Sequence, residues 1–276
     1  MDDSKKITGE FSVLLSVYYK ENPDFLRECL SSIYSSSLLP AEVILVKDGI
    51  LTKELDEVIS LYEVERGFKV LCLDSNKGLG VALNLGLKEC THSLVARMDA
   101  DDICEPNRFE RQYNYLIRHP HVSLLGGFIM EYNQDFTISK GMRVVPCSYP
   151  EIVKKCYLRN PFNHMTVMFN KEKIISVGSY KEHLFMEDYN LWLRLISSGC
   201  IVENLPEIFV KVRAGDEMVK RRAGTHYAKS EYKLMKLKNE LKITSQSCSF
   251  FVFIFRSLVR YLPITLIGKI YLLLRR

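Results

Sequence analysis

Three aspartates stand at positions 99, 101 and 102, directly after an apolar segment that begins at Leu94. Residues at i and i+2 of an extended segment point to the same side, so Asp99 and Asp101 can present their carboxylates to one point. Two neighbouring carboxylates repel each other unless a cation lies beside them. Hard oxygen ligands select Mg²⁺ or Mn²⁺, which keep coordination positions for substrate phosphates. The spacing therefore predicts a divalent metal site that serves phosphate chemistry.

Helix capping is the alternative explanation for these aspartates. Asp101 or Asp102 could cap a helix that begins near Pro106, because a side-chain oxygen at that position accepts from a free backbone amide. One cap needs one side chain, so capping leaves the other carboxylates unexplained. We therefore favour the metal site.

A second acidic pair, Glu187 and Asp188, lies within the segment FMEDYNLW. A carboxylate at a helix start, shielded by Phe185, Tyr189 and Trp192, can act as a general base. A favourable interaction with the helix dipole is the alternative role. The residue pattern alone leaves both roles open.

The aspartate cluster follows the last of four apolar, strand-forming segments that alternate with three helical ones. The expected strands are 11–19, 41–48, 68–74 and 92–99, and the expected helices are 22–37, 52–67 and 78–90. This alternation is typical of a parallel, doubly wound α/β sheet. Ligands bind beyond the carboxyl ends of the strands in such sheets, so the polar residues after each strand are expected at one site.

After about residue 120 the pattern changes to a mixture of strands and helices. Strands are expected at 121–132, 164–170 and 201–213, and helices at 150–159, 186–199 and 227–242. Acidic residues open the helix at 186–199, where the helix dipole favours them.

Positive charge is concentrated in the C-terminal part of the chain. Residues 211–276 hold 15 Lys and Arg against 4 Asp and Glu, whereas residues 1–210 hold 23 against 29. This asymmetry indicates an anionic partner, such as a membrane surface, nucleic acid or a phosphorylated substrate. The tail also carries the apolar run FFVFIF. We favour an interfacial helix on anionic lipid over a helix packed on the main domain.

Arginines 213, 221 and 222 belong to one basic segment that also contains Lys220. A solvated basic face is one explanation. The other is a clamp on a diphosphate, because the planar guanidinium suits phosphate oxygens.

The cysteines and the N-terminus indicate a reducing compartment. The chain has 8 cysteines, but no pair has the spacing of a zinc knuckle or a CxxC motif. Their scatter through apolar segments suggests buried thiols. The polar start MDDSKKITGE does not resemble a secretory signal, and no run of 18 apolar residues occurs. We expect a cytoplasmic protein, peripheral on the inner face of a membrane.

Six segments together resemble the family 2 inverting glycosyltransferases of the GT-A fold, a Rossmann-like α/β fold. More narrowly, they are similar to bacterial enzymes of amylovoran and O-antigen assembly. The resemblance covers roughly residues 11–215, with the motifs in the same order. The segments are SVYYKENPDFLRECLSSI, VILVKDG, NKGLGVALNLGL, VARMDADDICEPNRFERQ, NHMTVMF and MEDYNLWLRL.

The resemblance implies roles for individual positions. Asp101 matches the metal ligand of the family's Asp-x-Asp motif, and Asp99 matches its first aspartate, near the ribose and the metal. Asp188 matches the catalytic base, with Glu187 beside it. The remaining positions are nucleotide-sugar contacts at Ser16, Tyr18, Asp48, Lys77 and Arg97, and a diphosphate or acceptor contact at His164.

One position departs from the family pattern. Many members have two acidic residues after the second strand, whereas here Lys47 precedes Asp48. Asp48 matches the carboxylate that accepts a hydrogen bond from uracil, but the details of base recognition stay open.

The resemblance further implies a UDP-sugar-dependent hexosyltransferase of O-antigen or exopolysaccharide biosynthesis. Galactose or glucose would pass from its UDP derivative to a polyprenyl-diphosphate-linked GlcNAc or GalNAc, with a β-1,3 linkage. Asp188 would take the acceptor proton while Mg²⁺ or Mn²⁺ at Asp101 stabilises the departing UDP, which inverts the anomeric configuration. The catalytic domain would span 1–215, with a nucleotide-sugar half to about 105, an acceptor half from about 106, and a basic, helical, membrane-associating extension over 216–276.

Two other functions are weighed against this one. A nucleotidyltransferase would also bind a nucleotide on an α/β sheet. Such enzymes usually have a glycine-rich basic loop after the first strand, whereas SVYYKENPD contains no glycine. A non-catalytic membrane-surface adaptor would use its carboxylates only as helix caps. Metal-dependent binding of UDP would distinguish the transferase from the adaptor.

Overall fold

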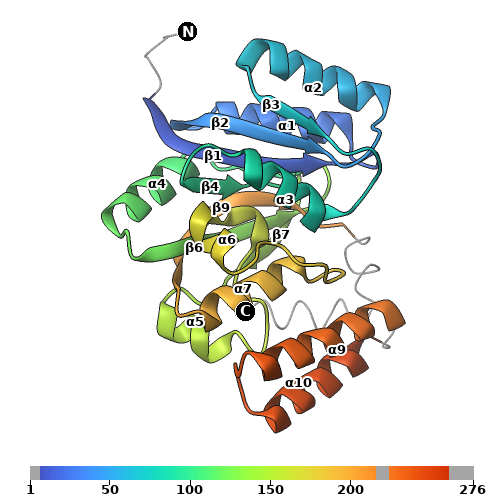
Figure 1. Cartoon of the computed structure of the whole chain (residues 1–276). Helices are drawn as coiled ribbons and strands as arrows, with labels where there is room; N and C mark the ends of the chain where they lie inside the picture. The colour runs from blue at the N-terminus through green and yellow to red at the C-terminus, as the bar shows by residue number, and fades with distance from the viewer. Residues whose placement is uncertain (1–6, 216–223, 261–276) are drawn as a thin grey trace.

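The computed structural model describes residues 7–215 and 224–260, whose strands form one mixed sheet (Figure 1). The strands are β1 (Ile7–Val17), β2 (Leu38–Lys47), β3 (Lys69–Cys72), β4 (Leu94–Arg97), β5 (Ile103–Cys104), β6 (Val122–Tyr132), β7 (Ser139–Arg143), β8 (Met168–Asn170) and β9 (Ile201–Arg213). Their order is β3-β2-β1-β4-β8-β6-β9-β5, and β7 pairs with β6. The four strands β3-β2-β1-β4 are parallel, which confirms the prediction for the first half of the chain. The second half adds antiparallel pairs, such as β4 with β8.

Helices follow most strands and begin at recognisable signals. Asn22 caps the first helix through its side chain, and Pro23 takes the first helical position, where no amide hydrogen is needed. The helices are α1 (Pro23–Tyr34), α2 (Lys53–Arg66), α3 (Leu79–Glu89), α4 (Arg108–Arg118), α5 (Tyr149–Lys155), α6 (Lys171–Ser176), α7 (Glu187–Ser197), α9 (Thr225–Glu240) and α10 (Gln246–Val259), with a 3₁₀ turn η1 at His164–Thr166.

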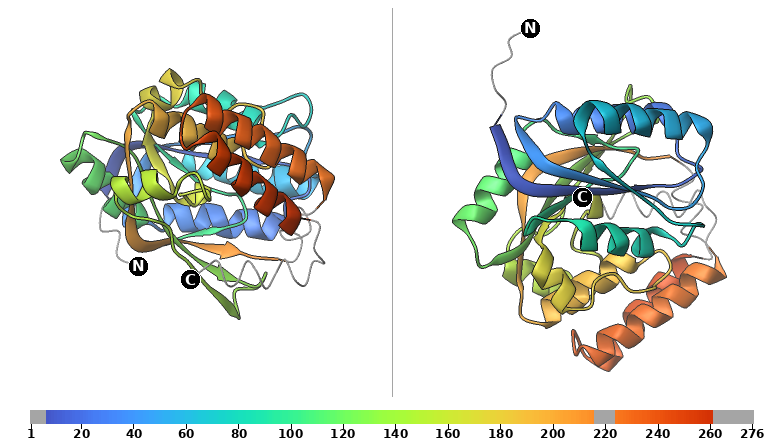
Figure 2. Two further views of the ribbon diagram at one scale, coloured as in Figure 1. Left: turned by 90° about the horizontal axis from the view of Figure 1, so that it is seen from below. Right: turned by 45° about the horizontal axis from the view of Figure 1, so that its top comes forward.

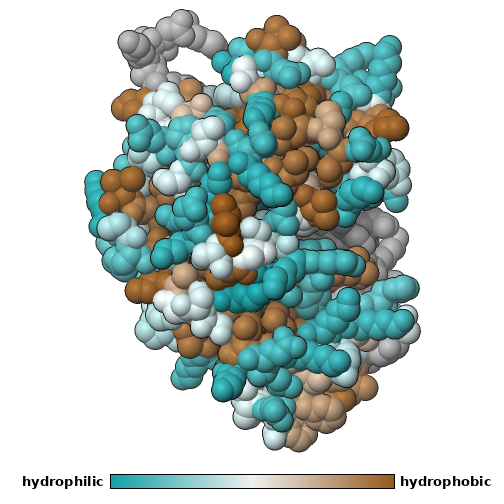
Figure 3. Space-filling view, viewed as in Figure 1, coloured by the Kyte–Doolittle hydropathy of each residue, from teal (hydrophilic) through white to brown (hydrophobic). Residues whose placement is uncertain are grey.

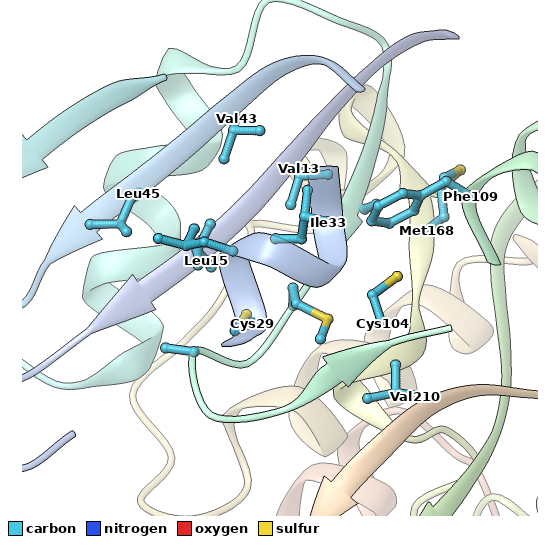
Figure 4. Packing of buried hydrophobic residues seen from close by; sticks show 14 of the residues in the cluster. Val13, Leu15, Cys29, Ile33, Val43, Leu45, Cys104, Phe109, Met168 and Val210 are labelled. Carbon is cyan, nitrogen blue, oxygen red and sulfur yellow. The ribbon is translucent and has the colours of Figure 1, made fainter. Parts of the chain in front are cut away.

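The sheet is buried on both faces, so its central strands carry continuous apolar runs rather than alternating ones. Along β1, Val13 and Leu15 belong to one core cluster, whereas Leu14 belongs to the other. Figure 4 shows Val13 and Leu15 packed near Ile33 and Cys29 of α1. This two-sided burial fixes the ends of the strands that carry the site.

Helix α3 packs very closely on the parallel strands because it has a glycine at the contact. A Cβ atom on Gly86 would lie 2.3 Å from Cδ1 of Leu14 and 2.8 Å from Cγ2 of Val46. Any larger residue there would push the helix away from β1 and β2. The close approach sets the position of the N-terminus of α3 at the edge of the sheet.

The segment 164–170 was expected to be a single strand, but only its last three residues are one. Its first part forms η1, because polar side chains there bond to the backbone of β6. Asn163 Nδ2 donates to the carbonyl of Gly127 at 2.8 Å, and Thr166 Oγ1 accepts from the amide of the same residue at 3.1 Å. Such side-chain contacts offer the chain an alternative to ladder pairing.

Helices α9 and α10 run alongside each other at one end of the molecule (Figure 2). The helix expected at 227–242 corresponds to α9. On the face drawn in Figure 3, hydrophilic side chains cover most of the region of α9. None of the helices in the described part of the chain combines the length and hydropathy that a transmembrane segment requires. Lys220, Arg221, Arg222 and the tail after residue 260 lie outside the described residues.

Candidate active site

The carboxyl ends of the parallel strands meet at one edge of the sheet. Ser16 pairs with Val46 of β2, and Leu14 pairs with Arg97 at the end of β4. The residues that follow these strands therefore project from the same edge. The edge contains the expected nucleotide contacts at Ser16, Tyr18, Asp48, Arg97 and Asp99.

The three aspartates after β4 form a compact cluster. Carboxylate oxygens of Asp99, Asp101 and Asp102 all lie within 4.8 Å of one another. Burial, followed by the charge of Asp99, raises the pKa of Asp101 to about 6. Burial and the charge of Asp101 raise the pKa of Asp102 well above its ordinary value. Three crowded acceptor-only groups of this kind fit a hard divalent cation, which would offset both the burial and the repulsion.

Arg97 supports the cluster from inside the protein. Its guanidinium is 2% exposed and makes an ion pair with Asp99. Its Nε and Nη1 have no hydrogen-bond partner among the described residues. Buried donors are nearly always satisfied, so these two nitrogens fit an anionic group such as a diphosphate.

Arg213 braces the same loop from the end of β9. Its backbone amide donates to Oδ1 of Asp102 at 3.1 Å, and its side chain donates to the carbonyls of Asp101 and Gln134. A further bond reaches the carboxylate of Glu28. All three guanidinium nitrogens thus donate to protein groups, which favours a role in positioning the aspartate loop over the diphosphate clamp that the basic segment suggested.

Asp48 is buried, and its carboxylate holds the loop that leads into α3. Oδ1 accepts from the amide of Lys77 at 2.7 Å, and Oδ2 accepts from the amide of Gly78 at 3.0 Å. Gly49 adopts a φ of 91°, and a Cβ there would lie 2.6 Å from the amide nitrogen of Asn76. Asp48 therefore fixes the loop between β3 and α3, while the side chain of Lys77 is exposed.

Glu187 and Asp188 open α7, as the sequence predicts. Asn160 Nδ2 donates to Oδ2 of Asp188 at 2.6 Å, and the amide of Tyr189 donates to Oδ1 at 2.7 Å. Burial raises the pKa of Asp188 despite these hydrogen bonds. Burial also raises the pKa of Glu187 to about 7. A carboxylate with a raised pKa suits general base catalysis near neutral pH.

Tyr180 feels the charges of both the aspartate cluster and the acidic pair of α7. Burial raises the pKa of Tyr180, and the charges of Arg97, Asp188 and Asp99 all act on it. The hydroxyl of Tyr180 lies 2.8 Å from Nε2 of His164. The charges of Asp99 and Asp188 thus both act on one side chain, which favours a single site for the aspartate cluster and the acidic pair of α7.

The neutral form of His164 is stabilised at this position. Burial, with the charge of Arg97 added, lowers its pKa well below the ordinary value. Helix α3 also reaches this region: a Cβ on Gly80 would lie 3.4 Å from Cγ of Glu187. The start of α3 thus lies close to the start of α7.

Two residues of this site have no sequence signal of their own. Asn160 and Tyr180 lie outside the strand ends and belong to no motif, and only the tertiary contacts reveal them. Arg221 and Arg222, expected near the acceptor diphosphate, lie outside the described residues.

A model of glycosyl transferase family 2 matches residues 12–185, a range that contains the aspartate cluster and ends just before Glu187. The chain belongs to glycosyl transferase family 2. This glycosyltransferase is 44% identical over 261 residues to the amylovoran biosynthesis glycosyltransferase AmsE of Erwinia amylovora, with 95% of this chain and 97% of AmsE covered. It is 38% identical over 264 residues to the UDP-Gal:alpha-D-GlcNAc-diphosphoundecaprenol beta-1,3-galactosyltransferase of Escherichia coli, with 96% of each chain covered.

Solved structures identify the fold of the glycosyltransferase. The mannosyltransferase PcManGT of Pyrobaculum calidifontis, solved with GDP-Man and Mn²⁺, superposes with a TM-score of 0.63 at 15% identity, covering 96% of this chain and 80% of that one. The fold is therefore GT-A. The comparisons confirm the family and the fold class that the sequence motifs predicted.

Proposed function

We propose that this glycosyltransferase moves galactose or glucose from its UDP derivative onto a polyprenyl-diphosphate-linked GlcNAc or GalNAc. The linkage is β-1,3, and the product enters O-antigen or exopolysaccharide assembly. The observation that supports the proposal is electrostatic: the charges of Asp99 and Asp188 both act on Tyr180, and the charge of Arg97 acts on both Tyr180 and Asp188. The printed name of the Escherichia coli relative supports this choice of donor and acceptor.

The chain's own residues account for the steps of a single displacement. Asn160 holds Asp188 through a 2.6 Å hydrogen bond, so that the free carboxylate lone pairs accept the proton of the acceptor hydroxyl. That oxygen bonds to the anomeric carbon on the face opposite the nucleotide, and the bond from this carbon to the diphosphate oxygen breaks. The buried guanidinium of Arg97, which is paired with Asp99, would supply positive charge beside the diphosphate.

Asp99 and Asp101 would hold Mg²⁺ or Mn²⁺, which supplies positive charge that stabilises UDP as it leaves. Asp102 contributes to the same cluster but also accepts from the amide of Arg213. The repulsion within the cluster and its raised pKa values support a bound cation in the working enzyme.

Helix α10 supports a peripheral position on the cytoplasmic face of a membrane. Its exposed apolar residues are Phe250, Phe251, Ile254, Phe255 and Leu258. Exposed lysines on the neighbouring α9 are Lys229, Lys233 and Lys236. Apolar insertion beside basic charge is the combination that binds anionic lipid surfaces, and it would place the enzyme beside a lipid-linked acceptor.

A donor screen tests the proposed function. UDP-galactose and UDP-glucose are each incubated with Mn²⁺ and a synthetic GlcNAc- or GalNAc-diphosphate lipid, and the glycosylated product is measured. We expect transfer by the unaltered chain and by Glu57→Gln, an exposed control on α2. Asp101→Ala and Asp188→Asn should both lose transfer. Equal product from all four proteins would contradict the site assignment.

A further inference from the structure

The loop that leads into the catalytic base has an unfavourable backbone conformation. Residues 177–186 connect α6 to α7, and within them Ser179 and Phe185 adopt φ values of 51° and 67°. Side chains other than glycine rarely adopt this region, so neighbouring structure must hold the loop in place. Phe185 stands only three residues before Asp188.

An aromatic stack connects this loop to α9. The ring of Phe185 lies 5.4 Å from that of Tyr227, with an angle of 16° between the planes. The guanidinium of Arg260, at the end of α10, lies 4.3 Å from the Tyr227 ring. Arg260 donates to Oε1 of the buried Glu231 at 3.1 Å, and Arg256 donates to Oε2 at 2.8 Å. The stack therefore extends from the base loop to both helices of the pair.

A second connection runs through His183. Its Nε2 lies 2.9 Å from the carbonyl of Ser230 on α9, and its Nδ1 lies 3.0 Å from Nδ2 of Asn190 on α7. A carbonyl can only accept, so Nε2 carries the hydrogen and Nδ1 accepts from the amide of Asn190. Buried and fully bonded in this way, His183 fixes the loop to α9 and to the base helix together.

The α9–α10 pair also contacts the segment that precedes Asn160, the residue that donates to Asp188. Lys238 Nζ donates to the carbonyl of Tyr157 at 2.7 Å, and Arg256 Nη1 donates to that of Leu158 at 3.0 Å. Asn160, which donates to Asp188, follows two residues later. Contacts from α9 and α10 thus reach Asp188 from two directions, through Phe185 and through Asn160.

We propose that the α9–α10 pair is a positioning element for the catalytic base, with Tyr227 as its central positioning residue. This proposal rests on the proposed function only for its kinetic consequence. Tyr227 stacks on Phe185, next to the start of α7, and its ring lies against the guanidinium of Arg260. Loss of its ring should therefore lower turnover and leave donor binding intact. The C-terminal extension then has a catalytic role that is separate from membrane attachment.

Three full-length variants test the kinetic consequence. Tyr227→Leu removes the stacked ring, Tyr227→Phe retains it, and Tyr232→Leu is the matched control, since its ring contacts Phe253 of α10 instead of the base loop. With an acceptor in detergent micelles, we expect Tyr227→Leu to lower kcat about tenfold while the KM for the UDP-sugar and the affinity for UDP stay unchanged. Tyr227→Phe and Tyr232→Leu should keep kcat. A parallel loss of UDP affinity, or an unchanged kcat in Tyr227→Leu, would overturn the proposal.

Hydrogen exchange tests the positioning role without any turnover. In the full chain without substrate, amides of residues 183–190 should exchange at least about threefold faster in Tyr227→Leu than in Tyr232→Leu. Equal exchange in these two folded proteins would refute the positioning role. If the unaltered chain transfers no sugar, the proposed function fails, but this measurement still decides the role of Tyr227.

Discussion

The aspartate loop at 99–102 and the base loop at 177–186 serve one reaction but are held in opposite ways. The aspartate loop follows a strand that is buried on both sides, and Arg213 braces it, yet its carboxylates repel one another. The base loop has satisfied hydrogen bonds around Asp188, yet two of its residues need support to keep their backbone conformation. The first loop therefore carries more negative charge than Arg97 and Arg213 offset, and the second depends on packing against distant segments.

Replacement of the base should give the largest effect. In Asp188→Asn the amide keeps the shape but cannot take a proton, so kcat should fall about 10³-fold. Affinity for UDP should stay within about twofold, because the proposed role of Asp188 is to take the proton of the acceptor hydroxyl. Transfer assays and calorimetric titration with UDP measure the two quantities.

Glu182→Gln, which changes an exposed carboxylate in the same loop, is the control and should keep full activity. A fall in UDP affinity that matches the fall in kcat would show that the two loops are not separable in this way.

The second prediction concerns the negative charge of the aspartate loop. Asp101→Asn removes one of three crowded carboxylates, so Mn²⁺-dependent UDP affinity should fall about 10²-fold. In EDTA the same variant should be more stable than the unaltered chain by about 1 kcal/mol, because one repulsive interaction has gone. Thermal unfolding in EDTA and in Mn²⁺ shows whether the substitution raises stability without the metal and weakens the response to it.

Glu57→Gln should change neither the stability in EDTA nor the response to Mn²⁺, since that carboxylate is exposed on α2. A lower stability of Asp101→Asn in EDTA would mean that the cluster is not under repulsion.

Replacement of Arg213, which holds the aspartate loop in place, should have a smaller effect. Arg213→Lys keeps the charge but loses the planar set of donors to Asp101, Gln134 and Glu28. We expect UDP affinity to fall about tenfold, with little change in the hydrogen exchange of the base loop. Arg111→Lys is the matched control, because the Arg111–Glu207 ion pair is exposed and contributes little to stability. Equal effects of the two changes would exclude a special role for Arg213.

The aspartate loop was predictable from sequence because its chemistry is local. Asp99, Asp101 and Asp102 occur within four positions at the end of an apolar strand, so neither tertiary packing nor a partner is needed to recognise them. The brace was not predictable in the same way. Arg213 lies 111 positions from Asp102, and the basic segment around it suggested contact with phosphate instead.

Around the proposed base, the sequence predicted only the acidic pair Glu187 and Asp188. Asn160 donates to Asp188, the charge of Asp188 acts on Tyr180, and Tyr227 stacks on Phe185. Nothing in the local sequence of these three residues distinguishes them from ordinary loop or helix residues. The parallel half of the sheet followed from alternating strands and helices. The strand expected at 164–170 was only partly right because Asn163 and Thr166 bond to β6 and replace ladder pairing with a turn.

The smallest expected effect is a shift in the pH dependence of kcat. This shift distinguishes the roles of Glu187 and Asp188. Burial raises the pKa of Asp188 and raises that of Glu187 to about 7. Transfer requires the ionised base, so kcat should fall as the pH falls through the raised pKa of Asp188, at a higher pH than for an unperturbed aspartate.

Glu187→Gln should keep the acidic limb but move it to lower pH by about one unit or less, because removing a neighbouring negative charge favours ionisation of Asp188. Measurements of kcat from pH 5 to 9 at saturating Mn²⁺ and donor, with Glu182→Gln as the control, determine the shift. If the limb instead moved to higher pH, Glu187 would be stabilising ionised Asp188, for example by donating a hydrogen bond to it. If Glu187→Gln lost kcat at every pH, Glu187 and not Asp188 would receive the proton. The pH profile of this variant therefore tests the assignment of the two carboxylates.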